Sequence, residues 1–196
     1  MKRVTVAILL VVGLLFIVMK FSNTTSAVDN INDVEHINYK NTYNMNDDEY
    51  IVYFWQESCK YCLEVKQDVN QYLQQSSAPI YIVDMKDTSN SNAWYNWEFH
   101  HQKYDQKIGT IKDGEEVLDE DIDLSDFEND KNVDWIIEIT ESNELIAHHN
   151  TPYANLEPNS VDELEITGTP TMLKIKNGKL EGYAVGVEQV RKLLVK

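Results

Sequence analysis

The sequence predicts an α/β protein in which a mixed sheet is flanked by helices. Two stretches carry this prediction. A strand, an amphipathic helix and a second strand follow one another over residues 50–83, and a hairpin followed by a helix closes the chain over residues 171–195. A strand–helix–strand unit favours parallel pairing, whereas a hairpin pairs antiparallel strands. We therefore expect one domain with a mixed sheet over residues 47–196.

The first unit begins with Tyr50–Trp55, which is β-branched and aromatic throughout and is typical of a buried central strand. The next stretch, Cys59–Gln75, carries apolar residues at helical spacing, and Ser58 in front of it is the expected helix cap. Ile80–Val83 predicts a second buried strand, parallel to the first. This order places two cysteines at the N-terminus of the helix.

At the C-terminal end, Asn177-Gly178 separates the predicted strands Thr171–Ile175 and Gly182–Val185 and is a strong hairpin signal. Val187–Val195 follows as an amphipathic helix. Residues 86–160 are too many for a structureless loop, so we expect an insertion with structure of its own. Its sequence predicts a helix within residues 93–107 and two short strands within residues 133–146.

Charge and the N-terminus bear on location. The 196 residues carry a formal net charge of -16. Beyond the first twenty residues, 14 basic face 33 acidic side chains, and this balance of -19 argues against nucleic acid as a partner and against membrane binding by charge. Lys2 and Arg3 precede the apolar run Val4–Met19, which predicts a signal anchor or signal peptide over residues 1–20.

A polar tether is expected over residues 21–46, with a first edge strand within residues 37–43. The predicted location is the cell membrane, with a single pass and the domain on the extracytoplasmic side. Residues 25–27 are small enough to permit cleavage, in which case the protein is secreted.

Cys59 and Cys62 are the two cysteines of the chain. A zinc site would need a second pair or nearby histidines, and a disulfide that closes so short a loop removes little entropy from the unfolded chain. Redox chemistry is favoured, with Cys59 as the nucleophile at the positive end of a helix and Cys62 as the resolving thiol. Lys60 either stabilises the Cys59 thiolate or is merely solvated. We expect no metal and no cofactor besides a redox-active Cys59–Cys62 disulfide.

Phe54-Trp55, the Cys59-Lys60-Tyr61-Cys62 motif and Gly168-Thr169-Pro170-Thr171 together resemble the thioredoxin superfamily, from about residue 50 to 196 and apart from the insertion. Exported thioredoxin-like proteins of Gram-positive bacteria, including bacteriocin transport accessory proteins, are similar in these motifs. The resemblance implies a thioredoxin-like fold in which Pro170 is cis and packs against the cysteines. It also implies that Thr169 pairs with the substrate and that Trp55 and Tyr61 support the site.

Three departures from thioredoxin bear on the direction of the reaction. Tyr53 replaces a buried aspartate, Lys60-Tyr61 replaces Gly-Pro, and the insertion stands where disulfide oxidases of the DsbA type carry a helical domain. We therefore expect an extracytoplasmic oxidoreductase that forms or isomerises disulfides in exported proteins and is reset by a membrane redox partner. The alternatives are a reductant fed by a membrane electron donor and a redox-silent secretion accessory module.

The paired histidines, His100-His101 and His148-His149, are predicted to be surface residues. Adjacent residues on a helix point apart, and no carboxylate spacing completes a metal site. The acidic run Asp119–Asp123 lacks the glycine and the ligand spacing of a calcium loop, so a solvated face is expected there.

Overall fold

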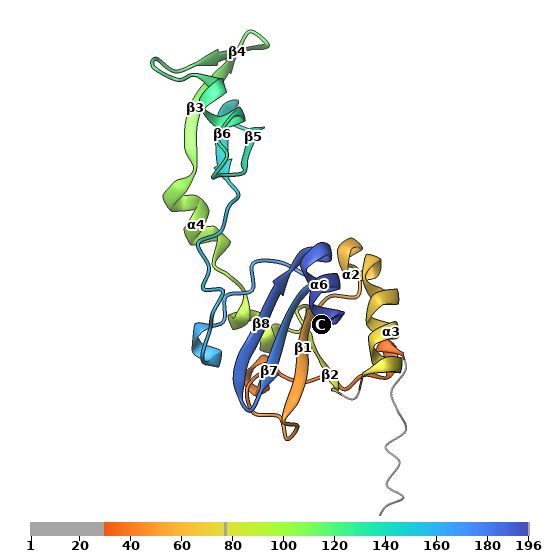
Figure 1. Ribbon diagram of the computed structural model, residues 1–196. Coiled ribbons are helices and arrows are strands. Elements are labelled where there is room, and N and C mark those ends of the chain that lie inside the picture. Colours follow the sequence, from red (N-terminus) through yellow and green to blue (C-terminus); the bar gives the residue numbers. More distant parts are fainter. Residues whose placement is uncertain (1–29, 77, 196) are drawn as a thin grey trace, which may run out of the picture.

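The computed structural model describes residues 30–76 and 78–195. These residues form two four-stranded sheets, with strand orders β2-β1-β7-β8 and β4-β3-β6-β5 (Figure 1). The predicted signal anchor over residues 1–20 lies outside the described residues. Within the described part, none of the helices has the length and apolar character needed to cross a membrane.

The first sheet is mixed, as predicted. β1 (Glu49–Trp55) pairs in parallel with β2 (Ile80–Asp84) and antiparallel with β7 (Thr171–Lys176), which forms a hairpin with β8 (Lys179–Val185). Both residues of the predicted hairpin turn, Asn177 and Gly178, have positive φ, at 49° and 71°. Such a turn matches the twist of the strands that it joins.

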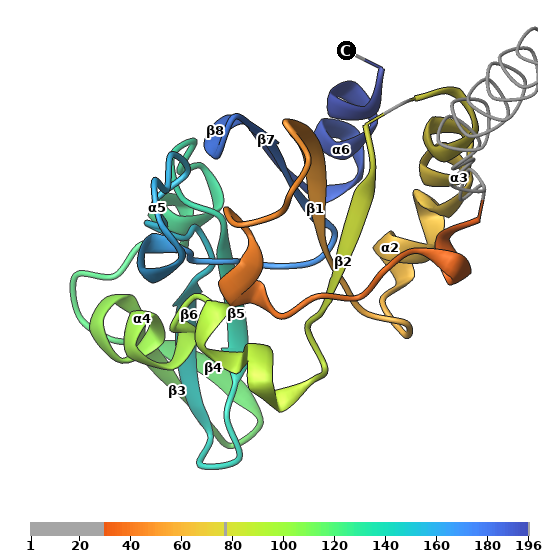
Figure 2. The ribbon, with the colours of Figure 1, turned by 90° about the horizontal axis from the view of Figure 1, so that it is seen from below.

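Three α-helices cover one face of this sheet: α2 (Lys60–Glu64), α3 (Lys66–Gln75) and α6 (Gly186–Leu194) (Figures 1 and 2). The predicted helix over residues 59–75 is broken at Val65, which joins α2 to α3. The core on this face combines sheet and helix side chains, among them Ile51, Tyr53, Ile82, Met172, Val65, Val69, Val190 and Leu194.

The opposite face is covered by irregular segments that contain the 3-10 helices Tyr39–Asn41, Thr88–Ala93 and Val161–Glu163. The predictions for residues 21–46 are therefore wrong over their described part. Ile31, in the 3-10 helix Ile31–Asp33, is buried against α3, and Tyr39 is buried on the opposite face, so this stretch is not a free tether. Residues 37–43 form no strand and contain the 3-10 helix Tyr39–Asn41, and the single bridge nearby, between His36 and Ile82, lies just before them.

The insertion forms a second body, which we call the insertion lobe (residues 97–150). Figure 1 shows it extending away from the first sheet. It has its own small core of Ile108, Phe127, Leu145 and Ala147. Its elements are α4 (Trp97–Tyr104), β3 (Gln106–Lys112), β4 (Glu115–Leu118), α5 (Leu124–Glu128), β5 (Trp135–Ile139) and β6 (Glu144–His149).

Contacts at the base of the lobe connect it to the sheet domain. Trp94 and Ile166 form a parallel bridge where the chain leaves for the lobe and returns from it. The Trp97 indole N–H donates a hydrogen bond to the Thr167 carbonyl oxygen at 3.0 Å. The sheet order, the helix after β1 and the hairpin–helix end together confirm the predicted thioredoxin-like fold, with an insertion between β2 and β7.

Candidate functional site: a dithiol beside a cis-proline

Cys59 lies at the N-terminus of α2, immediately after the turn that follows β1. The sequence predicted Ser58 as the helix cap, but Cys59 takes that position: its sulfur accepts a hydrogen bond from the Cys62 backbone N–H at 3.1 Å. A sulfur in a cap position faces the unpaired N–H groups of the first helical turn. The sequence-based prediction chose Ser58 because serine is a commoner N-cap residue than cysteine.

The Thr169–Pro170 peptide bond is cis, as the resemblance implied. Pro170 is buried, and its carbonyl oxygen accepts a hydrogen bond from the Gly186 N–H at 2.8 Å, which ties it to the start of α6. The Cys59 thiol donates to the Thr169 carbonyl oxygen at 3.3 Å. The structure therefore brings Cys59, Cys62, Thr169 and Pro170 together, as predicted from motifs 110 residues apart.

The two thiols differ in acidity. Partial burial alone raises the pKa of Cys59, but hydrogen bonds from the Cys62 and Thr169 side chains and from the backbone of Cys62 and Tyr61 outweigh it, so this pKa is lowered. Burial, followed by the hydrogen bond to Cys59, raises the pKa of Cys62 to about 11. Both cysteines are free thiols in this structure, with Cys59 half-buried and Cys62 fully buried. Cys59 is therefore the more acidic and more accessible thiol of the pair, and Cys62 is the less acidic one.

Tyr53 lies beneath the pair on β1 and is fully buried. Its hydroxyl oxygen has no hydrogen-bond partner of ordinary geometry among the described residues. Burial, with Cys62 as the next largest influence, raises the pKa of Tyr53. A neutral phenol thus occupies the place where thioredoxins carry an aspartate, and it brings no negative charge to the resolving thiol.

The other predicted site residues surround the pair. Trp55 packs at the edge of the core beneath α2, and its indole meets the His36 ring edge-on with centroids 6.2 Å apart. Lys60 extends over the Tyr61 ring, with its nitrogen 5.9 Å from the centroid, and is not among the groups that lower the pKa of Cys59. Tyr61 and Leu63 are more than half exposed.

Sequence reasoning missed Gln56. Its carbonyl oxygen accepts from the Cys59 N–H at 3.2 Å, and its side-chain oxygen accepts from the Thr169 hydroxyl at 3.3 Å. Gln56 thereby links the loop before α2 to the loop before β7. Its place directly after β1 was the available signal, because polar side chains that follow a central strand often line a site.

The histidine prediction is wrong for the buried pair. His100 on α4 and His149 on β6 have exposed fractions of 1% and 3%, and His100 Nε2 lies 2.9 Å from His149 Nδ1. Tyr95 and Tyr153 complete this cluster through contacts with His100 Nδ1 and His149 Nε2. The burial of His100 and His149 could not be predicted from the sequence, because it results from the packing of α4 on β6. This packing brings together residues 49 positions apart.

No family model matches this chain, and no curated protein matches its sequence. Among solved structures, mitochondrial thioredoxin 3 from Saccharomyces cerevisiae is similar, with a TM-score of 0.40 and 9% identity over 83% of this chain and 92% of that one. A mutant thioredoxin from Halobacterium salinarum has a TM-score of 0.38 and 10% identity over 87% and 92% of the two chains. These scores are too low to carry an argument, so the assignment of the fold rests on the strand order and the placement of the cysteines.

Proposed function

We propose that this protein is an extracytoplasmic thiol–disulfide oxidoreductase that acts on exported proteins through Cys59 and Cys62. The observation that carries the proposal is the asymmetry of the pair: a half-buried thiol of lowered pKa caps α2, and a fully buried thiol with a pKa of about 11 lies one helical turn behind it. A structural disulfide needs no such difference in acidity, whereas thiol exchange does.

The exchange involves two electrons. In disulfide formation, a substrate thiolate attacks Cys59 of the oxidised pair, a Cys59–substrate disulfide forms and Cys62 leaves as a thiolate that takes up a proton. A second substrate thiolate then attacks the sulfur bonded to Cys59, so the substrate gains a disulfide and the pair is left as a dithiol. Isomerisation starts from the dithiol, when Cys59 attacks a substrate disulfide, and ends without net electron transfer.

The direction that we favour is disulfide formation or isomerisation. Hydrogen bonds that stabilise the Cys59 thiolate stabilise the reduced form of the pair, which makes the disulfide more oxidising. The neutral Tyr53 in place of a carboxylate points the same way, because it offers no base to prepare Cys62 for attack. The alternative direction is reduction, with electrons supplied by a membrane donor. A measurement of the reduction potential of the pair distinguishes the two directions.

Substrate recognition is expected at the exposed side chains of Tyr61 and Leu63, which are close to Cys59 in the chain, and at the backbone of Thr169. An extended peptide that pairs with Thr169 would bring its sulfur to Cys59, which lies 3.3 Å from the Thr169 carbonyl oxygen. We place the domain outside the cytoplasmic membrane, since the run Val4–Met19 behind Lys2 and Arg3 is typical of a signal anchor. The partner that resets the pair would then be a membrane redox protein.

The test is the reduction potential of the pair in the full-length chain in detergent, equilibrated with graded glutathione buffers. A value between about -120 and -180 mV supports an oxidase or isomerase. A value of about -270 mV contradicts the favoured direction and indicates a reductant.

Trapping in cells that make the protein tests the activity itself. Cys62→Ser should accumulate mixed disulfides with exported proteins, because the Cys59 thiolate can attack a substrate disulfide and release one substrate thiol, but no Cys62 thiol is present to resolve the adduct. Cys59→Ser is the matched control and should accumulate none. Full function in the Cys59→Ser variant would contradict both enzymatic hypotheses, the oxidase or isomerase and the reductant. It would instead support a redox-silent accessory module.

A further inference from the structure

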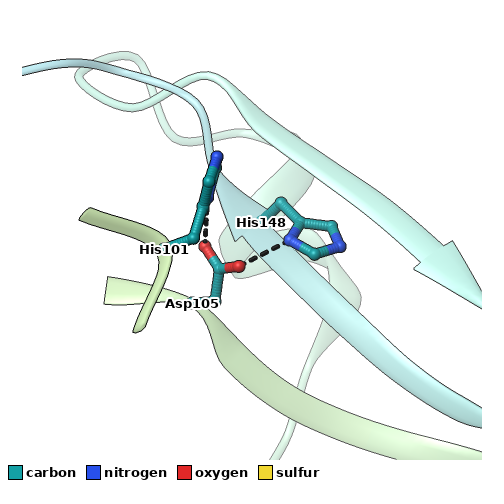
Figure 3. Close-up of side chains that lie close together, drawn as sticks. All are labelled: His101, Asp105 and His148. Carbon is teal, nitrogen blue, oxygen red and sulfur yellow. Dashed lines mark hydrogen bonds and ion pairs between the residues drawn. The ribbon is translucent and has the colours of Figure 1, made fainter. Parts of the chain in front are cut away.

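We propose that His101, Asp105 and His148 in the insertion lobe bind a divalent first-row transition-metal ion such as Zn²⁺. One ligand atom from each of these residues lies within 4.8 Å of those of the other two (Figure 3). His101 lies on α4, Asp105 follows the last residue of α4, and His148 lies on β6. The two elements α4 and β6 pack together. This site is separate from the dithiol and does not depend on the function proposed for it.

The carboxylate of Asp105 is placed between the two imidazoles. Its Oδ1 lies 2.9 Å from His101 Nδ1 and its Oδ2 lies 2.5 Å from His148 Nδ1, so both rings turn the same nitrogen toward it. Figure 3 shows the two rings on either side of the carboxylate. A metal ion that takes these two nitrogens and a carboxylate oxygen would replace the hydrogen bonds among them without moving a backbone segment.

A second set of contacts fixes the ligands. Asp105 Oδ1 also accepts a hydrogen bond from the His149 backbone N–H at 2.9 Å, which ties the carboxylate to β6. The His101 ring stacks on the Trp97 indole, with centroids 5.4 Å apart and planes at 23°. Beneath them, the buried His100–His149 pair holds α4 against β6. Outer contacts that orient ligands in this way are a usual part of metal sites.

The charges favour a cation. Residues 113–144 carry many acidic side chains, and Lys131 is their sole base. Burial raises the pKa of Asp105, but hydrogen bonds from His101, the His149 backbone and His148 outweigh it, so this pKa is lowered and the carboxylate is ionised at neutral pH. Two imidazoles with one carboxylate suit zinc and its first-row neighbours better than calcium or magnesium, which prefer all-oxygen sites.

The site opens to solvent. An open pocket of about 340 Å³ is lined by His101, Ile136, Glu138, His148 and Asn150. Glu138 Oε2 lies 3.8 Å from His148 Nε2 at the edge of this pocket. Three protein ligands beside an open pocket leave a coordination position for water or for an anionic ligand, as in zinc sites with an exchangeable ligand.

The experiment is a calorimetric titration of the full-length, untagged chain with Zn²⁺ in detergent, after oxidation of Cys59 and Cys62 to their disulfide. Oxidation removes the two thiolates, which would otherwise bind zinc themselves. We expect one ion per chain. Asp105→Asn and His148→Ala should each weaken binding by about tenfold or more. His36→Ala, which alters the one histidine outside the lobe, should leave binding unchanged.

Absence of zinc binding by the oxidised chain overturns the proposal, and so does binding that is unchanged in His148→Ala. Thermal unfolding without metal shows whether a variant is folded. Because a ligand that binds only the folded state stabilises it, Zn²⁺ should also raise the melting temperature of the parent chain and of His36→Ala, but not that of folded His148→Ala.

Discussion

The Cys59 sulfur lies 3.3 Å from the carbonyl oxygen of Thr169, the residue that precedes the cis-proline. This contact joins the helix-capping thiol to the loop that leads into β7. The Thr169 side chain contributes as well, because it is one of the groups that lower the pKa of Cys59. Thr169 therefore affects both the position and the acidity of the Cys59 thiol.

Thr169→Ala should raise the pKa of Cys59 and slow its alkylation at neutral pH, because one hydrogen-bonding group near the thiolate is removed. The measurement is the rate of iodoacetamide modification of the reduced chain at pH 7, with the circular dichroism spectrum as a check on folding. Thr167→Ala, two residues earlier, is the matched control and should react at the parent rate. Equal rates for both variants would mean that the Thr169 hydroxyl does not stabilise the thiolate.

The pH dependence of the same reaction should report on Cys59 directly. Because its pKa is lowered, alkylation should reach half its maximal rate at a lower pH than alkylation of an unperturbed cysteine in a short peptide. In Cys62→Ala the side-chain hydrogen bond to Cys59 is lost, so the midpoint should move to higher pH. A midpoint that stays in place in Cys62→Ala would assign the shift to the Thr169 side chain and the backbone N–H groups.

Tyr53→Phe should not destabilise the protein. The Tyr53 hydroxyl is buried without a hydrogen-bond partner of ordinary geometry among the described residues, so its removal relieves a desolvation cost. We expect the free energy of unfolding, from denaturant titration of the reduced chain, to stay the same or rise by about 1 kcal/mol. Tyr50→Phe is the control: the Tyr50 hydroxyl donates to the Thr42 carbonyl oxygen at 3.0 Å, so this variant should lose stability.

Trp97→Phe should weaken the junction between the two bodies, because it deletes the indole hydrogen bond to the Thr167 carbonyl oxygen. We expect a loss of about 1 kcal/mol in the free energy of unfolding and faster amide hydrogen exchange over residues 166–169. Trp135→Phe is a matched control, because that indole donates to Asp130 inside the lobe at 3.1 Å. Trp135→Phe should change amide hydrogen exchange within the lobe, and exchange over residues 166–169 should stay at the parent rate.

Gly109→Ala should destabilise the second sheet. A Cβ atom at Gly109 would lie 2.5 Å from the Val117 carbonyl oxygen and 3.0 Å from the Leu118 Cα, which are backbone atoms of the paired strand β4. We expect a loss of about 1–3 kcal/mol in the free energy of unfolding of the lobe. Gly168→Ala meets no atom within 4 Å in the part of the chain that the structure describes and should be neutral, although it lies next to the dithiol site.

The sheet domain could be predicted because its signals are local. β1 and β2 are short apolar runs, and the β7–β8 hairpin contains Asn-Gly. The dithiol site was predicted from two motifs, Cys59-Lys60-Tyr61-Cys62 and Gly168-Thr169-Pro170-Thr171. The fold brings these motifs into contact. The break of the helix at Val65 and the packing of residues 30–46 were missed, because both depend on contacts with residues distant in the sequence.

The lobe was predicted only in part. The strands β5 and β6 were expected, but β3 and β4 were not, because Gln106–Lys112 and Glu115–Leu118 are too polar to suggest buried strands. Asp113-Gly114 between them was the available signal, since both residues have positive φ, at 52° and 87°, as a tight hairpin turn requires. The histidine cluster could not be predicted from local spacing, because the pairing of α4 with β6 is decided by tertiary packing.

The stacking of Trp97 on His101 gives the lobe an optical reporter of its own. An indole in contact with an imidazole changes its fluorescence when that ring gains a proton or a ligand, so emission from Trp97 follows events at His101. Trp55, at the edge of the core of the sheet domain, can report on that domain. Two variants, one that keeps only Trp97 and one that keeps only Trp55, would therefore report on the lobe and on the sheet domain separately.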